Sequence, residues 1–227
     1  MPRTTVAAVL VLLAPLAAAT GVRADAMRCS NAYHPFGPTM QRAYQLISED
    51  VGNSSFKESF LDFSGDSFIH QIEYAEGGAL QARINCAADG SLSLAPPGMT
   101  FDGEVMPTMP GALLELSLPP EAEWQPGKTW THRVELGAGL PGAMGTATMA
   151  NEIVGLETVT VPAGTFDALK VETQVDQQVT LDLPGVGRQT MDLSHRATSW
   201  YAKGIGMVRS VSQEPDSMTV ELVDYRQ

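Results

Sequence analysis

The sequence predicts an all-β fold, a strongly curved antiparallel sheet or open barrel built of successive hairpins. Two observations predict it. Apolar and polar residues alternate with a period of two over most of the chain after residue 55, which is the pattern of strands with one buried face. Turn signals rich in Gly, Pro and Asp separate these runs at intervals of roughly ten residues, which is typical of antiparallel hairpins.

Residues 1–24 have the pattern of a secretory signal peptide. Arg3 supplies the positive start, Val6–Ala19 is an apolar stretch, and Val22 and Ala24 are small residues before a cleavage point. We therefore expect an exported protein, periplasmic or extracellular, whose mature chain starts near Asp25. No later segment approaches the roughly 20 apolar residues of a spanning helix, so no transmembrane segment is expected.

The charge balance of the mature chain is strongly acidic. Without Arg3 and Arg23 it keeps 12 basic and 26 acidic residues, a net charge of −14. Such a charge disfavours nucleic acid and anionic lipid surfaces as partners.

Cys29 and Cys86 are the only two cysteines of the chain. In an exported protein they predict a disulfide, worth roughly 2–4 kcal/mol, with two free thiols as the alternative. Lipid attachment at Cys29 would need small and aliphatic residues directly before it, and Arg28 disfavours that outcome.

Residues 25–95 form the predicted N-terminal β half. Its clearest feature is a hairpin around Gly77-Gly78. The residues on its apolar face are Phe68, His70, Ile72, Tyr74, Leu80, Ala82, Ile84 and Cys86. Residues 38–48 fit two structures: Met40, Tyr44 and Ile47 have helical spacing, whereas Arg42, Tyr44 and Leu46 share one face of a strand.

Residues 96–123 are rich in Pro, Gly and Met and predict a long connection that carries one short strand at Leu114–Leu118. Residues 124–227 form the predicted C-terminal β half, with strands resuming at Trp130 and a hairpin that turns at Pro162-Ala163-Gly164. The later strands are expected at Val179–Leu183, Met191–Trp200, Met207–Val211 and Val220–Tyr225.

Three segments of the C-terminal half carry a resemblance to a known family. They are Val159–Val171 (VTVPAGTFDALKV), Trp200–Val208 (WYAKGIGMV) and Glu221–Tyr225 (ELVDY), preceded by an opening with Trp124, Pro126, Gly127 and Trp130. This half resembles the DUF3108-like, or TapB-like, group of secreted bacterial proteins, and the N-terminal half resembles it only weakly. The resemblance implies an antiparallel β-rich envelope protein and no established reaction.

Aromatic residues beside predicted turns are the candidates for a ligand pocket. They are Trp130, Phe166, Trp200 and Tyr201, to which Met191 is added. Side chains of this kind line apolar pockets, but they also close the ends of a sheet, and the second interpretation is the simpler one.

Three histidines, His70, His132 and His195, fall on the apolar faces of their strands, and three converging imidazoles would suit zinc or copper. The simpler interpretation is three separate histidines, each with its own local hydrogen bonds. The group Met99, Met106 and Met109 allows a Cu(I) site, but methionine is also an adaptable filler of apolar surfaces. We therefore expect no metal and no cofactor.

No catalytic site is expected, because the sequence has no G-x-S-x-G elbow and no H-E-x-x-H motif. Neighbouring Ser194 and His195 lie on opposite faces of a strand and cannot form a dyad. The function hypothesis is an exported non-enzymatic envelope protein that binds or carries an apolar ligand such as a lipid. The alternatives are an interaction or structural module of an envelope assembly, or a periplasmic metal-binding protein.

Overall fold

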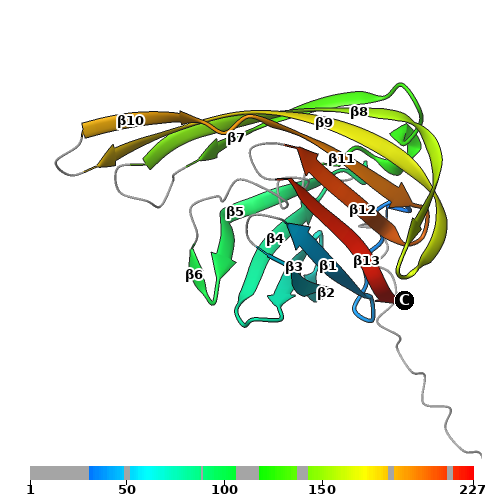
Figure 1. Ribbon diagram of the computed structural model, residues 1–227. Helices are drawn as coiled ribbons and strands as arrows, with labels where there is room; N and C mark the ends of the chain where they lie inside the picture. Colours follow the sequence, from blue (N-terminus) through cyan, green and yellow to red (C-terminus); the bar gives the residue numbers. More distant parts are fainter. Residues whose placement is uncertain are drawn as a thin grey trace, which may run out of the picture.

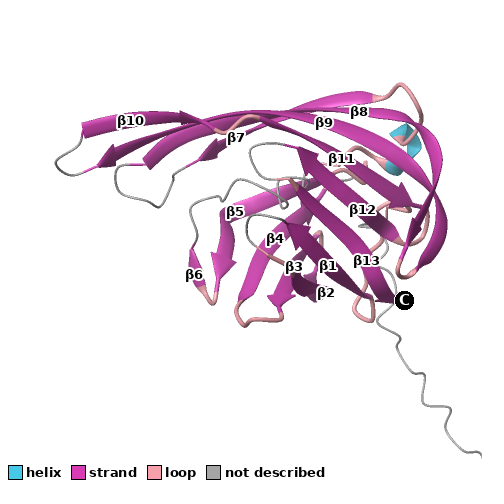
Figure 2. Ribbon diagram, in the orientation of Figure 1, coloured by secondary structure: helices cyan, strands magenta, loops and turns pink. Residues whose placement is uncertain are grey.

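The structure is a computed structural model that describes residues 31–48, 52–87, 89–105, 118–136, 143–183, 187–213 and 217–227. Within this part of the chain it is an all-β protein (Figures 1 and 2). The N-terminal strands are β1 (Gln41–Ser48), β2 (Ser54–Ser64), β3 (Ser67–Tyr74), β4 (Ala79–Cys86), β5 (Leu92–Phe101) and β6 (Glu104–Val105). The C-terminal strands are β7 (Thr129–Leu136), β8 (Ala143–Val161), β9 (Gly164–Leu183), β10 (Gly187–Asp192), β11 (His195–Ala202), β12 (Gly206–Gln213) and β13 (Met218–Arg226). A short 3-10 turn, η2 (Glu121–Glu123), precedes β7.

All thirteen described strands belong to one antiparallel sheet. Their order is β6-β5-β4-β3-β2-β1-β13-β12-β11-β9-β8-β7, and β10 pairs with β9 beside this path. The described pairs leave the sheet open, because β6 and β7 lie at its two ends. The predicted fold class, a strongly curved open sheet of successive hairpins, is therefore confirmed.

One hydrophobic core joins the two halves of the chain. The first and last strands pair, with Tyr44 opposite Leu222, so that the two halves form a continuous wall. Buried residues from β2–β4 and from β8, β9 and β11–β13 then pack in the same cluster, among them Phe60, Ile84 and Ile153. We call this curled part of the sheet the body, and its interior is filled by these side chains.

Strands β8 and β9 are much longer than their neighbours, at 19 and 20 residues. At one end their hairpin curls back onto β13, where the amide of Ala163 donates a hydrogen bond to the carbonyl of Leu222 at 3.1 Å. At the other end they extend with β7 and β10 past the body, to the left in Figure 1, as a four-stranded arm.

The three segments that carry the family resemblance meet in space. Phe166 lies 6.1 Å from Tyr225 between ring centroids, Lys170 pairs with Trp200, and Arg209, next to the second segment, pairs with Glu221 of the third. Their occurrence together in this sequence therefore has a structural reason. Together they form the contact between the long hairpin and the strands that end the chain.

Several sequence-based boundaries are corrected. The predicted connection at residues 96–123 is wrong in its first part, because β5 continues through Pro96 and Pro97 to Phe101 and β6 follows it. These prolines lie near the end of the sheet, where fewer ladder hydrogen bonds are lost. The predicted strand Met191–Trp200 is divided at Leu193-Ser194 into β10 and β11. Of the two structures that fitted residues 38–48, a helix or a strand, the chain forms the strand, at Gln41–Ser48.

Other expectations fall on residues that the structure does not describe. Residues 1–30, with the predicted signal peptide and Cys29, lie outside the described residues, as does Leu114–Leu118 apart from Leu118, which pairs with Leu92. Within the described ranges, no helix reaches the length and hydropathy that crossing a membrane requires.

Cys86 lies on the core face of β4, as predicted, and is buried. We predict that it is bonded to Cys29 in the mature protein. Alkylation without reductant should leave the intact mass unmodified and two hydrogens below that of the reduced chain, and alkylation after reduction should add two groups. Labelling of either cysteine before reduction of the folded, oxidised protein would contradict the bond.

Candidate functional site

A charged side chain, Arg42 of β1, lies inside the body with 1% of its side chain exposed. Its guanidinium contacts three separate segments. Nε donates a hydrogen bond to the carbonyl of Ile205 at 2.7 Å, Nη1 donates to Oε2 of Glu58 at 3.0 Å, and Nη2 donates to the carbonyl of Pro35. Arg42 thus ties the segment before β1 and the turn before β12 to the inner face of the sheet.

Glu58 and His70, which are buried, and His34, which is partly buried, complete this cluster. Glu58 and His70 lie on the inner faces of β2 and β3, and Nε2 of His70 is 3.5 Å from Oε1 of Glu58. The rings of His34 and His70 are 6.5 Å apart, edge to face, and Phe60 stacks on His70 at 5.2 Å. The polar side chains of the cluster therefore pack against aromatic rings as well as against one another.

The electrostatics of the cluster fix two protonation states. Burial opposes the charge on Glu58, but its interactions with His70 and Arg42 outweigh burial and lower the pKa of its carboxyl from 4.5 to about 2. Burial, together with the positive charge of Arg42, lowers the pKa of His34 from 6.5 to about 3. At neutral pH the cluster therefore contains an Arg–Glu ion pair beside a neutral His34.

The three candidate histidines do not form one site. His132 and His195 lie at the two ends of a cross-strand row that also contains Met149 and Val175, three strand spacings or roughly 14 Å apart. His70 belongs to β3, which four strands separate from β11 in the sheet. No group of three or more metal-ligating side chains occurs among the described residues.

The five ligand-pocket candidates are dispersed. Trp130 and Tyr201 both pack on Trp124, at 6.2 and 5.1 Å between ring centroids, in the body. Trp200 is partly buried against the main core cluster, and its indole donates to Oε2 of Glu157 at 2.9 Å. Phe166 is at the far hairpin tip beside Tyr225.

The fifth pocket candidate, Met191, belongs to the arm. It lies on the face of the arm that continues from the core face of the body, in a row with Gly145 and Val179, and 41% of it is exposed. Met144, which is 57% exposed, neighbours this row but points to the opposite, threonine-rich face, where Thr180 and Thr190 share a hydrogen bond.

A polar row separates the core of the body from the arm. The hydroxyl of Thr173 donates to Oδ1 of Asn151 at 2.8 Å, and the amide of Asn151 donates to the carbonyl of Trp130 at 3.4 Å. Beyond this row a second, small apolar cluster begins with Ala147, Met149 and Val175. We call this cluster, with Gln177, Val179 and Met191 on the same face, the arm patch.

Gln177 is the unusual member of the arm patch. Its side chain is fully buried, yet neither its Oε1 nor its Nε2 has a hydrogen-bond partner among the described residues. Its backbone is paired: the backbone N–H donates to Oγ of Ser194, and the carbonyl accepts from the backbone N–H of Leu193. An unpaired buried amide costs about 1–3 kcal/mol, so a partner for this group would be strongly favoured.

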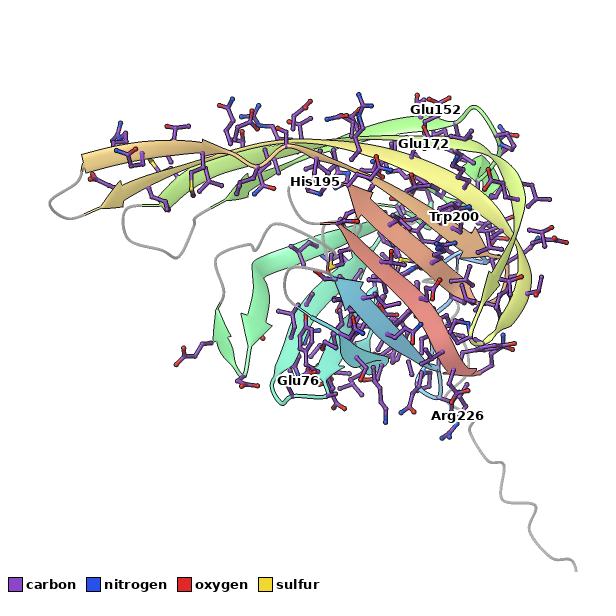
Figure 3. The ribbon with its side chains drawn as sticks, in the orientation of Figure 1. Glu76, Glu152, Glu172, His195, Trp200 and Arg226 are labelled. Atoms are coloured by element: carbon purple, nitrogen blue, oxygen red, sulfur yellow. The ribbon has the colours of Figure 1, made fainter. Side chains whose placement is uncertain are left out.

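The outer face of the sheet contains a shallow groove of about 660 Å³ over β7, β8, β9 and β11. Most of its lining is polar, and Glu152 and Glu172 lie opposite each other in it (Figure 3). Lys170 stands 3.1 Å from Glu172 and 3.7 Å from Glu157, which compensates part of this acidic charge. The groove has the composition of a solvated surface.

Three residues of these sites were missed by sequence reasoning although the sequence carried a signal for each. Arg42, Glu58 and Gln177 are polar residues at positions where the period-two pattern requires an apolar one. A polar residue on the apolar side of a strand predicts a buried polar group that needs a partner.

Comparison with known proteins finds a family model that is similar to part of the chain. Residues 133–216 match the DUF3108-like family model. The resemblance noted in the C-terminal half is thereby confirmed over these residues, which include the whole of the long hairpin, the arm strand β10 and the turn before β12. No curated protein sequence matches the chain.

Three solved structures are similar to this chain. An exported protein with a YmcC-like fold from Bacteroides fragilis has 16% identity and a TM-score of 0.44, covering 87% of this chain and 100% of that one. A lipoprotein from Parabacteroides distasonis has 13% identity and a TM-score of 0.48, covering 87% and 99%. The hypothetical lipoprotein YmcC from Escherichia coli has 9% identity and a TM-score of 0.38, covering 84% and 86%.

The segment that matches the DUF3108-like model contains Gly206, the glycine that lies against Arg42. Gly206 has a φ of +102°, and a Cβ there would lie 2.9 Å from Cζ of Arg42. We predict that Gly206→Ala lowers the free energy of unfolding by about 1–3 kcal/mol, because it adds backbone strain to a collision with a buried guanidinium. Urea denaturation measures the loss.

Gly204→Ala is the matched control for that variant. Gly204 has a similar φ of +80°, but nothing lies within 4 Å of a Cβ at this position. It should therefore show the backbone strain alone and lose less stability than Gly206→Ala. Equal losses in the two variants would mean that the contact with Arg42 contributes nothing.

The lowered pKa of the partly buried His34 predicts a pH-dependent stability. Unfolded His34 binds a proton below pH 6.5, whereas folded His34 does so only near pH 3, so between these values the unfolded state holds more protons. Stability should fall with decreasing pH over this window, by at most about 1.4 kcal/mol per pH unit from this residue. Glu58 acts in the same direction between pH 4.5 and 2, since its folded pKa is also the lower one.

The variant His34→Gln tests this assignment. It removes the proton uptake of His34 on unfolding, so its stability should decline less steeply than that of the wild type between pH 6.5 and 5. The measurement is the urea midpoint and slope at each pH. Parallel pH profiles for the two proteins would contradict the neutral state of His34 in the folded protein.

Proposed function

We propose that this is an exported, non-enzymatic protein of the bacterial envelope that binds an apolar ligand on the arm patch. Export is supported by the signal pattern of residues 1–24 and by the likeness to structures described as an exported protein and as lipoproteins. The absence of a recognisable catalytic motif from the sequence agrees with a binding role.

The observation that carries the proposal is the arrangement of the arm. The core face of the sheet continues past the polar row of Asn151 and Thr173 onto strands that extend beyond the body (Figure 1). Along this face the side chains change from buried at Met149 to half-buried at Val179 and exposed at Met191. An apolar face of this kind is favoured as a binding surface because covering it removes apolar area from water.

The body is a less suitable place for the ligand. Its interior is occupied by the packed side chains of the main cluster and by the satisfied hydrogen bonds of Arg42. A ligand there would have to displace side chains that hold the fold. Binding on the arm patch requires no such displacement at its exposed end.

Native mass spectrometry of the mature protein, purified from its own envelope, tests the proposal. We expect an added mass that solvent extraction identifies as an apolar molecule. Met191→Asp should reduce the bound amount several-fold, because it places a charge on the apolar face.

Met144→Asp is the control for that measurement. It introduces the same charge on an exposed methionine of the same arm, but on the opposite face. Its ligand content should equal that of the wild type. A bare protein mass, or equal ligand content in both variants, would exclude the arm patch, and a retained protein in place of a small molecule would favour the alternative role in an envelope assembly.

A further inference from the structure

The buried amide of Gln177 specifies the chemistry of the ligand more closely. We propose that the arm patch binds an acyl chain that ends in a neutral group able both to donate and to accept a hydrogen bond, such as a carboxamide or a protonated carboxylic acid, and that Gln177 recognises this head group. This inference rests on the proposed function of the arm patch.

The first step of the argument is the position of Gln177. It lies between Val175 and Val179 on the inner face of β9, with the small Ala147 opposite it on β8. The next pair toward the end of the arm is Gly145 and Val179, and the next pair toward the body is Met149 and Val175, so that beside Gln177 strand β8 contributes a methyl group and, toward the body, the side chain of Met149. The full burial of the amide therefore does not come from β8 alone, and a head group would reach it by displacing what else covers it.

The second step is the break in the sheet beside Gln177. Strand β10 ends at Asp192 and β11 begins at His195, so Leu193 and Ser194 flank Gln177 without a regular ladder. Ser194 uses its hydroxyl to accept from the backbone amide of Gln177 at 3.1 Å. The groups at the break therefore satisfy the backbone of Gln177 and leave its side-chain amide to another partner.

The third step is hydrogen-bond complementarity. A side-chain amide offers an oxygen acceptor and N–H donors side by side. A carboxamide or a protonated carboxyl matches both in one planar pair, whereas an ester can only accept. A charged head is disfavoured, because Gln177 is fully buried and its neutral amide cannot compensate a buried charge.

The fourth step concerns the chain of the ligand. From Gln177 the apolar face runs outward through Val179 to Leu181, with Met191 beside Val179. Four residues of strand span about 13 Å, which accommodates an acyl chain of medium length. The head would thus lie at the buried end of the arm patch and the chain along its exposed end.

The test uses delipidated mature protein and two probes, dodecanamide and methyl dodecanoate. These have the same chain, but only the amide can both donate and accept. We expect dodecanamide to bind the wild type about tenfold more tightly than methyl dodecanoate does. The reason is that the amide makes one more hydrogen bond in a buried site than the ester can. Gln177→Met, which keeps an unbranched side chain of similar length, should lose this preference while still binding both probes.

The outcomes separate this inference from the proposed function. If neither probe binds, both are wrong. If both probes bind with equal affinity to the wild type, or if Gln177→Met keeps the preference, apolar binding stands and the assignment of Gln177 is overturned. Should Gln177→Met fail to fold, the side-chain amide resonances of Gln177 in the wild type decide the matter: a shift on adding dodecanamide but not the ester supports the assignment, and identical responses overturn it.

Discussion

The buried guanidinium of Arg42 is the constraint on which the rest of the body depends. A charge in an apolar interior is tolerated only when its donors are paired, and the partners of Arg42 come from the segment before β1, from β2 and from the turn before β12. These segments are far apart in sequence, so the guanidinium holds the two halves of the chain in one register. Removing the Glu58 partner of such a buried pair typically costs about 3–5 kcal/mol.

The family-like segments take their form from the same constraint. Gly206 leaves room for the guanidinium, and Ile205 supplies the carbonyl that accepts from its Nε. The long hairpin then closes over β13 through Ala163 and Leu222. The conspicuous sequence motifs are thus explained by the construction of the body, and they say little about what the protein binds.

The body, which stabilises the fold, and the arm, which carries the proposed binding surface, are accordingly different parts of one sheet. The polar row of Asn151 and Thr173 marks the boundary between them. On one side the core face is filled and its buried charges are paired. On the other side it becomes progressively exposed toward Met191 and contains an amide without a partner among the described residues.

Much of the fold could be predicted from the sequence, because the period-two pattern directly reports which side of a strand is buried. It correctly placed Phe68, Ile84 and Cys86 inside, and the turn signals correctly gave a succession of hairpins. The pairing of β1 with β13 could not be predicted, since it depends on contacts between the two ends of the chain that no local pattern encodes. The break at Leu193-Ser194 likewise depends on how β10 and β11 share the single long strand β9.

The candidate site was harder to predict than the fold. Trp200 and Tyr201 are consecutive but have different partners, since Trp200 contacts Glu157 and Arg209 whereas Tyr201 packs on Trp124. His132 and His195 share a row but stand three strands apart. The informative positions were instead polar residues in apolar registers: Arg42, Glu58 and Gln177. Sequence shows that such residues are buried, but only the assembled sheet shows whether a partner reaches them.

Hydrogen exchange tests the central claim, that the ligand lies on the arm and the body holds the fold, most directly. The mature protein as purified from its envelope would be compared with the same protein after solvent extraction. We predict that extraction speeds exchange at the amides of residues 143–149 and 175–181 and leaves the strands around Arg42 unchanged. Faster exchange centred on β1–β4, with the arm unaffected, would contradict the claim and place the ligand in the body.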